Sequence, residues 1–119
     1  MKENFLIEKS VNFAARIIRL NQYLKTQREY VISKQILRSG TSIGANIYEA
    51  EYAQSKADFI SKMHIALKET AETEYWLRLL HASGFLTDPM YDSIQKDCLD
   101  IKRILIKSIN TAKNNIQKK

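Results

Sequence analysis

The sequence predicts an all-α protein, an up-down-up-down antiparallel four-helix bundle in which residues 1–119 form a single domain. Three observations lead to this prediction. The chain has only three glycines and one proline, whereas a sheet protein needs many turns. Apolar residues recur at helical spacing in four long segments. Only a few residues separate consecutive segments, so neighbouring helices must run antiparallel.

The first helix is expected from about Glu3 to Lys25, with two apolar stripes side by side. One stripe consists of Ile7, Val11, Ala14 and Ile18. The other consists of Leu6, Phe13, Ile17, Leu20 and Leu24. Together they form an apolar arc wider than one bundle seam requires. We therefore expect part of this arc to contact another molecule.

The second helix is expected from about Gln27 to Ala53, because Thr26 and Glu29 have the spacing of a capping box. Its core stripe contains Ile32, Ile36, Gly40, Ile43 and Ile47. A glycine costs a helix interior about 1 kcal/mol relative to alanine. A phosphate-binding loop does not explain the glycines here, because no strand precedes them and the Lys-Ser/Thr ending of a P-loop is missing.

Gly40 and Gly44 lie on different faces of this helix. Gly40 is on the core stripe, so we expect it to let a neighbouring helix come close within the bundle. Gly44 lies on a shoulder roughly 100° away from that stripe. We expect its close contact to lie outside the bundle, which again indicates self-association.

The last two helices have clear start and stop signals. Ser55 is expected to cap the third helix, with Asp58 at the third position of the capping box. Gly84 supplies a left-handed stop just after this helix, which is expected to reach Ser83. Thr87 or Asp88 then caps the fourth helix, which has a proline in its first turn.

Charge is unevenly distributed along a chain whose formal net charge is +6. Residues 9–28 contain five basic residues and no acidic one, and residues 101–119 contain six and none. This asymmetry favours an anionic partner, with a solvated basic surface as the alternative. The first and fourth helices would be adjacent, and the candidate nucleic-acid-binding residues on them are Lys9, Arg16, Arg19, Lys96, Arg103, Lys107 and Lys118.

The sequence gives little support for catalysis. His64 and His81 lack the upstream arginine that helical ribonucleases of the HEPN type need, and no Glu-x-x-His pair of a di-iron bundle occurs. Cys98 lies on an apolar stripe and is expected in the core. We therefore predict no catalytic residue, no metal site and no cofactor. The lone cysteine and the lack of an apolar run long enough to span a membrane favour a cytoplasmic protein.

The stretch from Gln35 to Leu80 resembles the 23S rRNA intervening-sequence protein family. The residues that carry the resemblance are Arg38, Ser42, Ile43, Asn46, Ile47, Glu49 and Ala50. Much of the family has glycine in place of Ala50, so the turn after the second helix is expected to be looser or displaced.

The resemblance implies a cytoplasmic bacterial protein whose four-helix subunits form a ring-shaped homopentamer. The accessory variability protein of diversity-generating retroelements is similar, and it is a basic pentamer that binds nucleic acid and a reverse transcriptase. The resemblance therefore implies RNA or DNA and a reverse transcriptase as candidate partners. The motif and interface residues that follow from it and from the glycines are Arg38, Gly40, Ser42, Ile43, Gly44, Asn46, Ile47 and Glu49.

Two hypotheses about function follow. In the first, the protein is a nucleic-acid-binding accessory protein that contacts phosphates without reading sequence. In the second, it is a protein-interaction scaffold whose charge has no binding role. The polar stripe Arg38, Ser42, Asn46 and Glu49 likewise has a structural interpretation, contacts within itself or with a neighbouring helix, and a binding interpretation, the lining of a groove.

Overall fold

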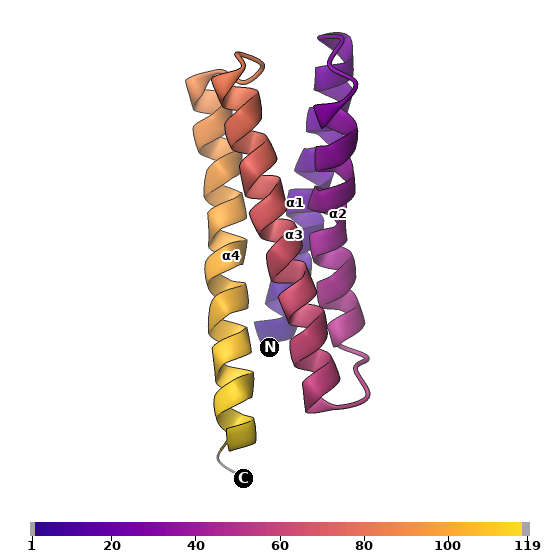
Figure 1. Cartoon of the computed structure of the whole chain (residues 1–119), viewed down its shortest axis with the longest axis vertical. Coiled ribbons are helices and arrows are strands. Elements are labelled where there is room, and N and C mark those ends of the chain that lie inside the picture. The colour runs from indigo at the N-terminus through magenta and orange to yellow at the C-terminus, as the bar shows by residue number, and fades with distance from the viewer. Residues whose placement is uncertain (1, 118–119) are drawn as a thin grey trace.

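Four long antiparallel helices make up the computed structural model, which describes residues 2–117 and the side chains of residues 5–115 (Figure 1). The helices are α1 (Lys2–Thr26), α2 (Ile32–Ala50), α3 (Lys56–Ala82) and α4 (Asp88–Gln117). Each helix packs against the next, and α4 also contacts α1, which closes the bundle. The molecule measures 53 × 22 × 21 Å. The predicted up-down-up-down four-helix bundle is confirmed.

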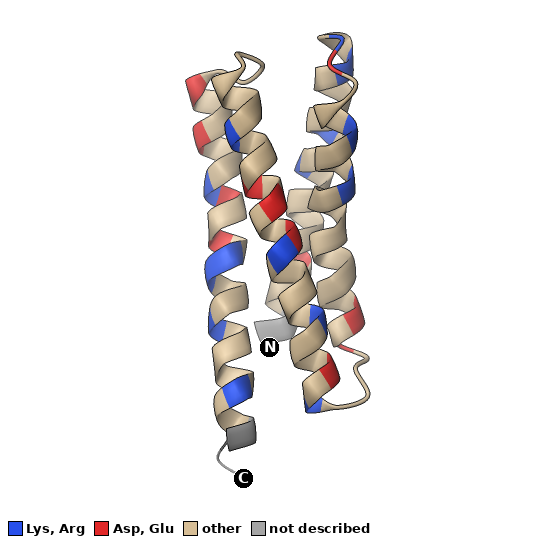
Figure 2. Ribbon diagram, viewed as in Figure 1, with Lys and Arg blue, Asp and Glu red and all other residues tan. Residues whose placement is uncertain are grey.

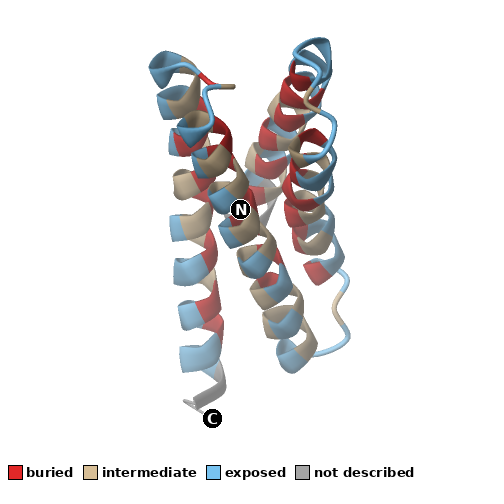
Figure 3. Cartoon of the chain, turned by 45° about the horizontal axis from the view of Figure 1, so that its top comes forward, coloured by how far each residue is buried: buried red, intermediate tan, exposed pale blue. Residues whose placement is uncertain are grey.

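The core runs along the axis between the four helices, where the buried faces meet (Figure 3). On α1 it contains the second of the two predicted stripes, Leu6, Phe13, Ile17, Leu20 and Leu24. Facing residues from the other helices include Ile43, Leu77, Ile101 and Leu105, which are completely buried. Burial of each such side chain contributes about 1.5–3 kcal/mol. The other stripe of α1 is left partly in solvent, where Val11 is 59% exposed.

Helix α3 begins and ends as the sequence predicts. The Ser55 hydroxyl accepts a hydrogen bond from the Asp58 amide at 3.0 Å. At the other end Gly84 has a φ of 85°, the left-handed conformation that glycine adopts without strain. The amide of Phe85 then donates to the carbonyl of Leu80 at 2.9 Å, as in a Schellman motif.

Helix α4 begins at the Thr-Asp-Pro sequence. Of the two candidate caps, Thr87 is the one that acts, because its hydroxyl accepts a hydrogen bond from the Met90 amide at 3.3 Å. Asp88 is the first helical residue. Pro89 follows it, in the first turn, where a missing backbone N–H leaves no helical hydrogen bond unmade.

The connection between α1 and α2 differs from the prediction, and the proposed capping box at Thr26 is wrong. Thr26 is the last residue of α1, and its hydroxyl donates to the carbonyl of Tyr23 at 2.6 Å. Arg28 then takes a φ of 61°, which stops the helix. The amide of Glu29 closes this stop by donating to the carbonyl of Leu24 at 2.9 Å.

Glu29 caps α2 by itself. Its carboxylate accepts hydrogen bonds from the amides of Val31, Ile32 and Ser33, at 3.2, 3.0 and 2.6 Å. These are N–H groups that the first turn of a helix cannot satisfy internally. Helix α2 therefore begins at Ile32, later than expected.

Helix α2 also ends earlier than predicted, at Ala50, and the chain continues in a turn. The amide of Tyr52 donates to the carbonyl of Glu49 at 3.0 Å. This hydrogen bond spans three residues, as in a 3₁₀ turn, instead of the four of an α-helix. Ala50 itself is buried against the core. The alanine that stands where much of the family has glycine is thus the last helical residue.

Candidate self-association and nucleic-acid surfaces

An apolar groove follows the outer side of the pair formed by α1 and α2. It has a volume of about 550 Å³. Its lining residues are Ile7, Ser10, Val11, Ala14, Ala15, Ile18, Thr41, Gly44, Ala45, Tyr48 and Glu49. Among them Val11 is 59%, Ile18 45% and Tyr48 54% exposed. We call these lining residues the α1–α2 groove. Side chains this apolar usually lie against a partner when they gather in one patch.

The two glycines of α2 both make room for α1. A Cβ atom on Gly40 would lie 2.8 Å from both Cγ atoms of Ile17, which confirms the close approach within the bundle. A Cβ atom on Gly44 would lie 2.9 Å from the hydroxyl of Ser10. The close approach at Gly44 is therefore to α1 of the same chain, and a contact of Gly44 with another molecule stays a prediction. The shoulder of α2 faces α1 of the same chain, because the two helices cross close enough to meet over more than one stripe.

The polar stripe of α2 is satisfied by α3 within the chain. Arg38 forms ion pairs with Glu69, at 3.2 Å, and with Glu72. Glu72 also accepts a hydrogen bond from the Trp76 indole at 3.0 Å. The bond from Arg38, and secondly that from Trp76, hold the pKa of the Glu72 carboxyl below its usual range. These contacts favour the structural interpretation of the stripe.

The remaining residues of this stripe also have partners in the chain. Glu49 pairs with Lys62 of α3 at 3.1 Å. Ser42 donates to the carbonyl of Arg38 at 2.6 Å, and Asn46 donates to the carbonyl of Ser42 at 2.9 Å. The apolar motif residues between them, Ile43 and Ile47, lie in the core.

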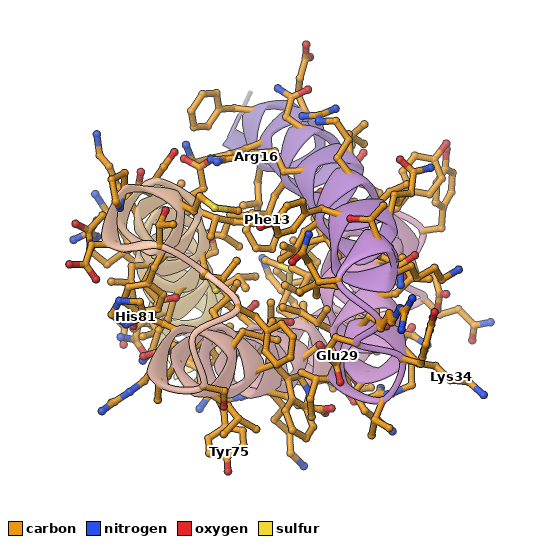
Figure 4. All side chains as sticks on the ribbon, turned by 90° about the horizontal axis from the view of Figure 1, so that it is seen from above. Phe13, Arg16, Glu29, Lys34, Tyr75 and His81 are labelled. Carbon is orange, nitrogen blue, oxygen red and sulfur yellow. The ribbon has the colours of Figure 1, made fainter. Side chains whose placement is uncertain are left out.

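Helices α1 and α4 are adjacent as predicted, but carboxylates interrupt the basic stripes where they meet. Arg16 reaches from α1 to α4 and pairs with Asp97 at 2.7 Å (Figure 4). Lys9 lies 3.9 Å from Asp100. Arg103 is paired with the same aspartate. Much of the positive charge predicted for this seam is thus neutralised inside the chain.

The other residues predicted for this surface lie apart from those ion pairs. Arg19, Lys96 and Lys107 are exposed. Lys118 lies outside the described residues. Binding of nucleic acid by these residues stays a prediction.

A second hollow, of about 540 Å³, lies at the opposite end of the bundle from the α1–α2 connection. Apolar walls come from Phe5, Phe59 and Ile104, and two lysines, Lys56 and Lys107, are part of the lining. Sequence reasoning missed it because it forms where the ends of three helices and the α2–α3 connection meet. No periodicity within one helix indicates such a meeting.

His81 and Cys98 both contact other residues of the bundle. The Nε2 atom of His81 lies 2.6 Å from Asp88, and its ring stacks on Tyr91 at 4.3 Å between centroids. Cys98 is completely buried, as predicted, and burial raises the pKa of its thiol to about 12.

Among the described residues no three His, Cys, Asp or Glu side chains gather as metal ligands do. Within residues 2–117 no helix is long and apolar enough to cross a membrane.

These features define the class of protein as a compact antiparallel four-helix bundle with a partly exposed apolar face and, among its described residues, no group of side chains that could hold a metal ion. Comparison with known families identifies the family to which the chain belongs. The 23S rRNA-intervening sequence protein family matches residues 2–107, and the chain belongs to that family. The sequence-based resemblance is thereby confirmed, whereas the relation to the retroelement protein stays a prediction. The family is not named for an enzymatic activity.

A solved structure from Bacteroides thetaiotaomicron is similar over nearly its whole length. It is described as a protein of unknown function from the S23 ribosomal protein family. The two chains are 56% identical, and the match covers 92% of this chain and 99% of the other with a TM-score of 0.90. Comparison with curated proteins gives no match.

Proposed function

We propose that the protein is a non-enzymatic, self-associating helical protein whose α1–α2 groove docks on further copies of the chain. The observation that carries this proposal is the gathering of Val11, Ile18 and Tyr48 in one apolar groove instead of in the core. Small residues such as Ala14 and Ala45 lie between these larger side chains. A surface of large side chains around small ones can interdigitate with another helix surface.

The proposed assembly is a homopentameric ring, a number that rests on the family resemblance. A ring needs the same pair of surfaces on every copy, and it closes when the rotation between copies is a whole fraction of a turn. The non-enzymatic part of the proposal is supported by the surroundings of Cys98, which is completely buried and has a raised pKa.

Light scattering after size exclusion tests the assembly. At micromolar concentration the protein is expected to have a multiple of its 13.8 kDa mass, five times if the ring is a pentamer. The double variant Val11→Lys, Ile18→Lys is expected to be monomeric and helical, because both side chains are already substantially exposed in one chain. Gly44→Leu is a poorer test, since the added side chain would collide with Ser10.

A matched control places the same substitution on other helices. Ile65 of α3 and Ile106 of α4 are each 40% exposed and lie outside the α1–α2 groove. The variant Ile65→Lys, Ile106→Lys is expected to keep the wild-type mass. Monomeric wild-type protein, or a groove variant of unchanged mass, contradicts the proposed interface.

Binding of the phosphate backbone of RNA or DNA is a second candidate function. Lys96, Arg103 and Lys107 support it, because their spacing puts them on the outer face of α4, and Lys96 and Lys107 have no ion pair among the described residues. Such binding weakens steeply as salt rises, with a slope set by the number of phosphates contacted. A titration with mixed-sequence RNA and DNA at several salt concentrations tests it. No binding at low salt favours the scaffold alternative.

A further inference from the structure

The uncompensated positive charge of α1 and α2 is concentrated at one end of the molecule. Residues 9–38 contain seven basic residues and one acidic residue, Glu29. Lys9, Arg16 and Arg38 are paired with carboxylates of α3 and α4. The other four are exposed and have no ion pair among the described residues. We call them the tip cluster: Arg19, Lys25, Arg28 and Lys34.

Two of these cations share a face. Lys25 follows Ile18 by two helical turns on α1, and Lys34 precedes Thr41 by two turns on α2. Because Ile18 and Thr41 both line the α1–α2 groove, the two lysines continue the same face beyond the end of the groove. Figure 2 shows the basic segments gathered at this end of α1 and α2.

The connection between the lysines holds Arg28 in a fixed place. Its φ of 61° is fixed by the hydrogen bonds that end α1. The nearby carboxylate, Glu29, is engaged by three backbone amides of the first turn of α2. Glu29 therefore offsets the positive end of that helix and forms no ion pair with the tip cluster. A binding surface held in place loses less conformational entropy when a ligand binds.

Exposed aromatic and apolar side chains accompany the cations. Tyr30 and Val31 lie in the α1–α2 connection, 62% and 69% exposed. The solvent-exposed ring of Tyr30 comes two residues after Arg28 and four before Lys34. An exposed aromatic ring flanked by cations is the arrangement by which proteins hold single strands, with bases stacked on the ring and phosphates on the cations.

We propose that the tip cluster and Tyr30 bind single-stranded nucleic acid. The inference rests on the nucleic-acid function proposed above, and it moves the principal contact from the α1–α4 seam to the α1–α2 end. Carboxylates of α4 pair with Lys9, Arg16 and Arg103 at the seam, whereas the tip cluster forms no ion pair within the described part of the chain. A single strand offers both phosphates for the cations and an unpaired base for the ring of Tyr30, which a duplex does not.

The test is a fluorescence anisotropy titration of labelled single-stranded RNA and DNA at several salt concentrations. The tip variant Lys25→Gln, Arg28→Gln, Lys34→Gln is expected to bind at least about ten-fold more weakly than wild type at low salt. Its log–log salt slope is expected to fall by about 2 for each copy in contact, since about 0.7 is lost per phosphate contact on a single strand.

The matched control, Lys68→Gln, Arg78→Gln, Lys113→Gln, loses the same charge from exposed positions of α3 and α4 that belong to neither candidate surface. It is expected to bind nearly as wild type does. Tyr30→Ser is expected to weaken binding while leaving the salt slope unchanged, because it removes stacking and no charge. Light scattering on every variant checks that the oligomeric mass is unchanged.

Arg28→Gly separates binding from folding. Glycine adopts a positive φ more easily than arginine, so this variant is expected to unfold at a higher temperature than wild type. It is also expected to bind the single strand more weakly, because one cation is gone. A more stable protein that binds less cannot owe its loss of binding to unfolding.

The outcomes distinguish the two proposals. If wild type binds no nucleic acid at low salt, the nucleic-acid function fails and this inference fails with it. If wild type binds, but the tip variant binds equally well or the matched control loses as much, the function stands and the tip is not its site. Binding to anionic lipid vesicles in a sedimentation assay, without binding to single strands, also overturns the inference.

Discussion

Cys98 is the residue whose chemistry its surroundings change most clearly. Its side chain is completely buried, and its thiol lies 3.7 Å from the carbonyl of Thr70. Burial is the main cause that raises its pKa from 9.0 to about 12, and the negative charge of Glu74 adds to it. The reactive thiolate is therefore scarce in the folded protein at neutral pH.

We expect the native protein to resist alkylation of this thiol at pH 8 and to react only as it unfolds. The pKa is raised in the folded state, so its stabilising contribution is complete below about pH 9, where the unfolded thiol ionises. It is lost as pH rises toward about 12, by up to about 1.4 kcal/mol per pH unit. Urea unfolding of wild type and Cys98→Ala from pH 8 to 11 measures this, and equal pH slopes for the two proteins contradict it.

At the scale of elements, the crossing of α1 and α2 depends on Gly40. A Cβ atom there would lie 2.8 Å from two carbons of Ile17, which is itself completely buried. Overpacking of this kind costs about 1–3 kcal/mol. The better helix propensity of alanine returns about 1 kcal/mol.

We therefore expect Gly40→Ala to destabilise the wild-type chain by about 1 kcal/mol, measured by denaturant unfolding. In an Ile17→Ala background both Cγ atoms are gone and only the Cβ atom, at 3.2 Å, stays close, so the same substitution is expected to be neutral or stabilising. The double-mutant cycle thus predicts a change of sign. A stabilising Gly40→Ala in the wild-type background shows that the helices can separate at no cost.

The elements also show what sequence can and cannot predict. Ser55 and Gly84 mark helix ends correctly, because a side-chain cap and a left-handed glycine act through their own backbone. The α1–α2 connection was mispredicted because arginine is a poor residue for a positive φ. Its conformation depends on the hydrogen bond from Glu29 to Leu24, which no local preference indicates.

Contacts between side chains of different helices, on which the candidate sites depend, were harder to predict than the helix ends. The apolar and basic stripes were visible, because they repeat along one helix. That Arg16 meets Asp97, or that Gly44 faces Ser10, depends on how each helix is rotated about its own axis. This rotation is set by the packing of all four helices around one core, which the stripe on a single helix does not determine.

At the scale of the whole molecule, most carboxylates and the α1–α2 groove lie on different halves of the bundle. The α3–α4 half has most of the carboxylates, and several of them reach across to cations of the other half, as Glu72 does to Arg38 and Asp97 to Arg16. The α1–α2 half keeps an apolar groove with a basic end. In a ring built through the groove, the basic ends of several copies would lie near one another, so weak phosphate contacts would add.

Self-association through the groove has a thermodynamic consequence. An assembly that forms only from folded chains is stabilised by mass action, so its melting temperature rises with protein concentration. Wild-type protein is expected to melt at a higher temperature when its concentration is raised a hundredfold, as calorimetry or circular dichroism can measure. The Val11→Lys, Ile18→Lys variant is expected to melt lower and independently of concentration, because its groove cannot bury those positions against another copy. The Ile65→Lys, Ile106→Lys control is expected to keep the wild-type dependence. A wild-type melting temperature that does not change with concentration contradicts self-association through folded chains.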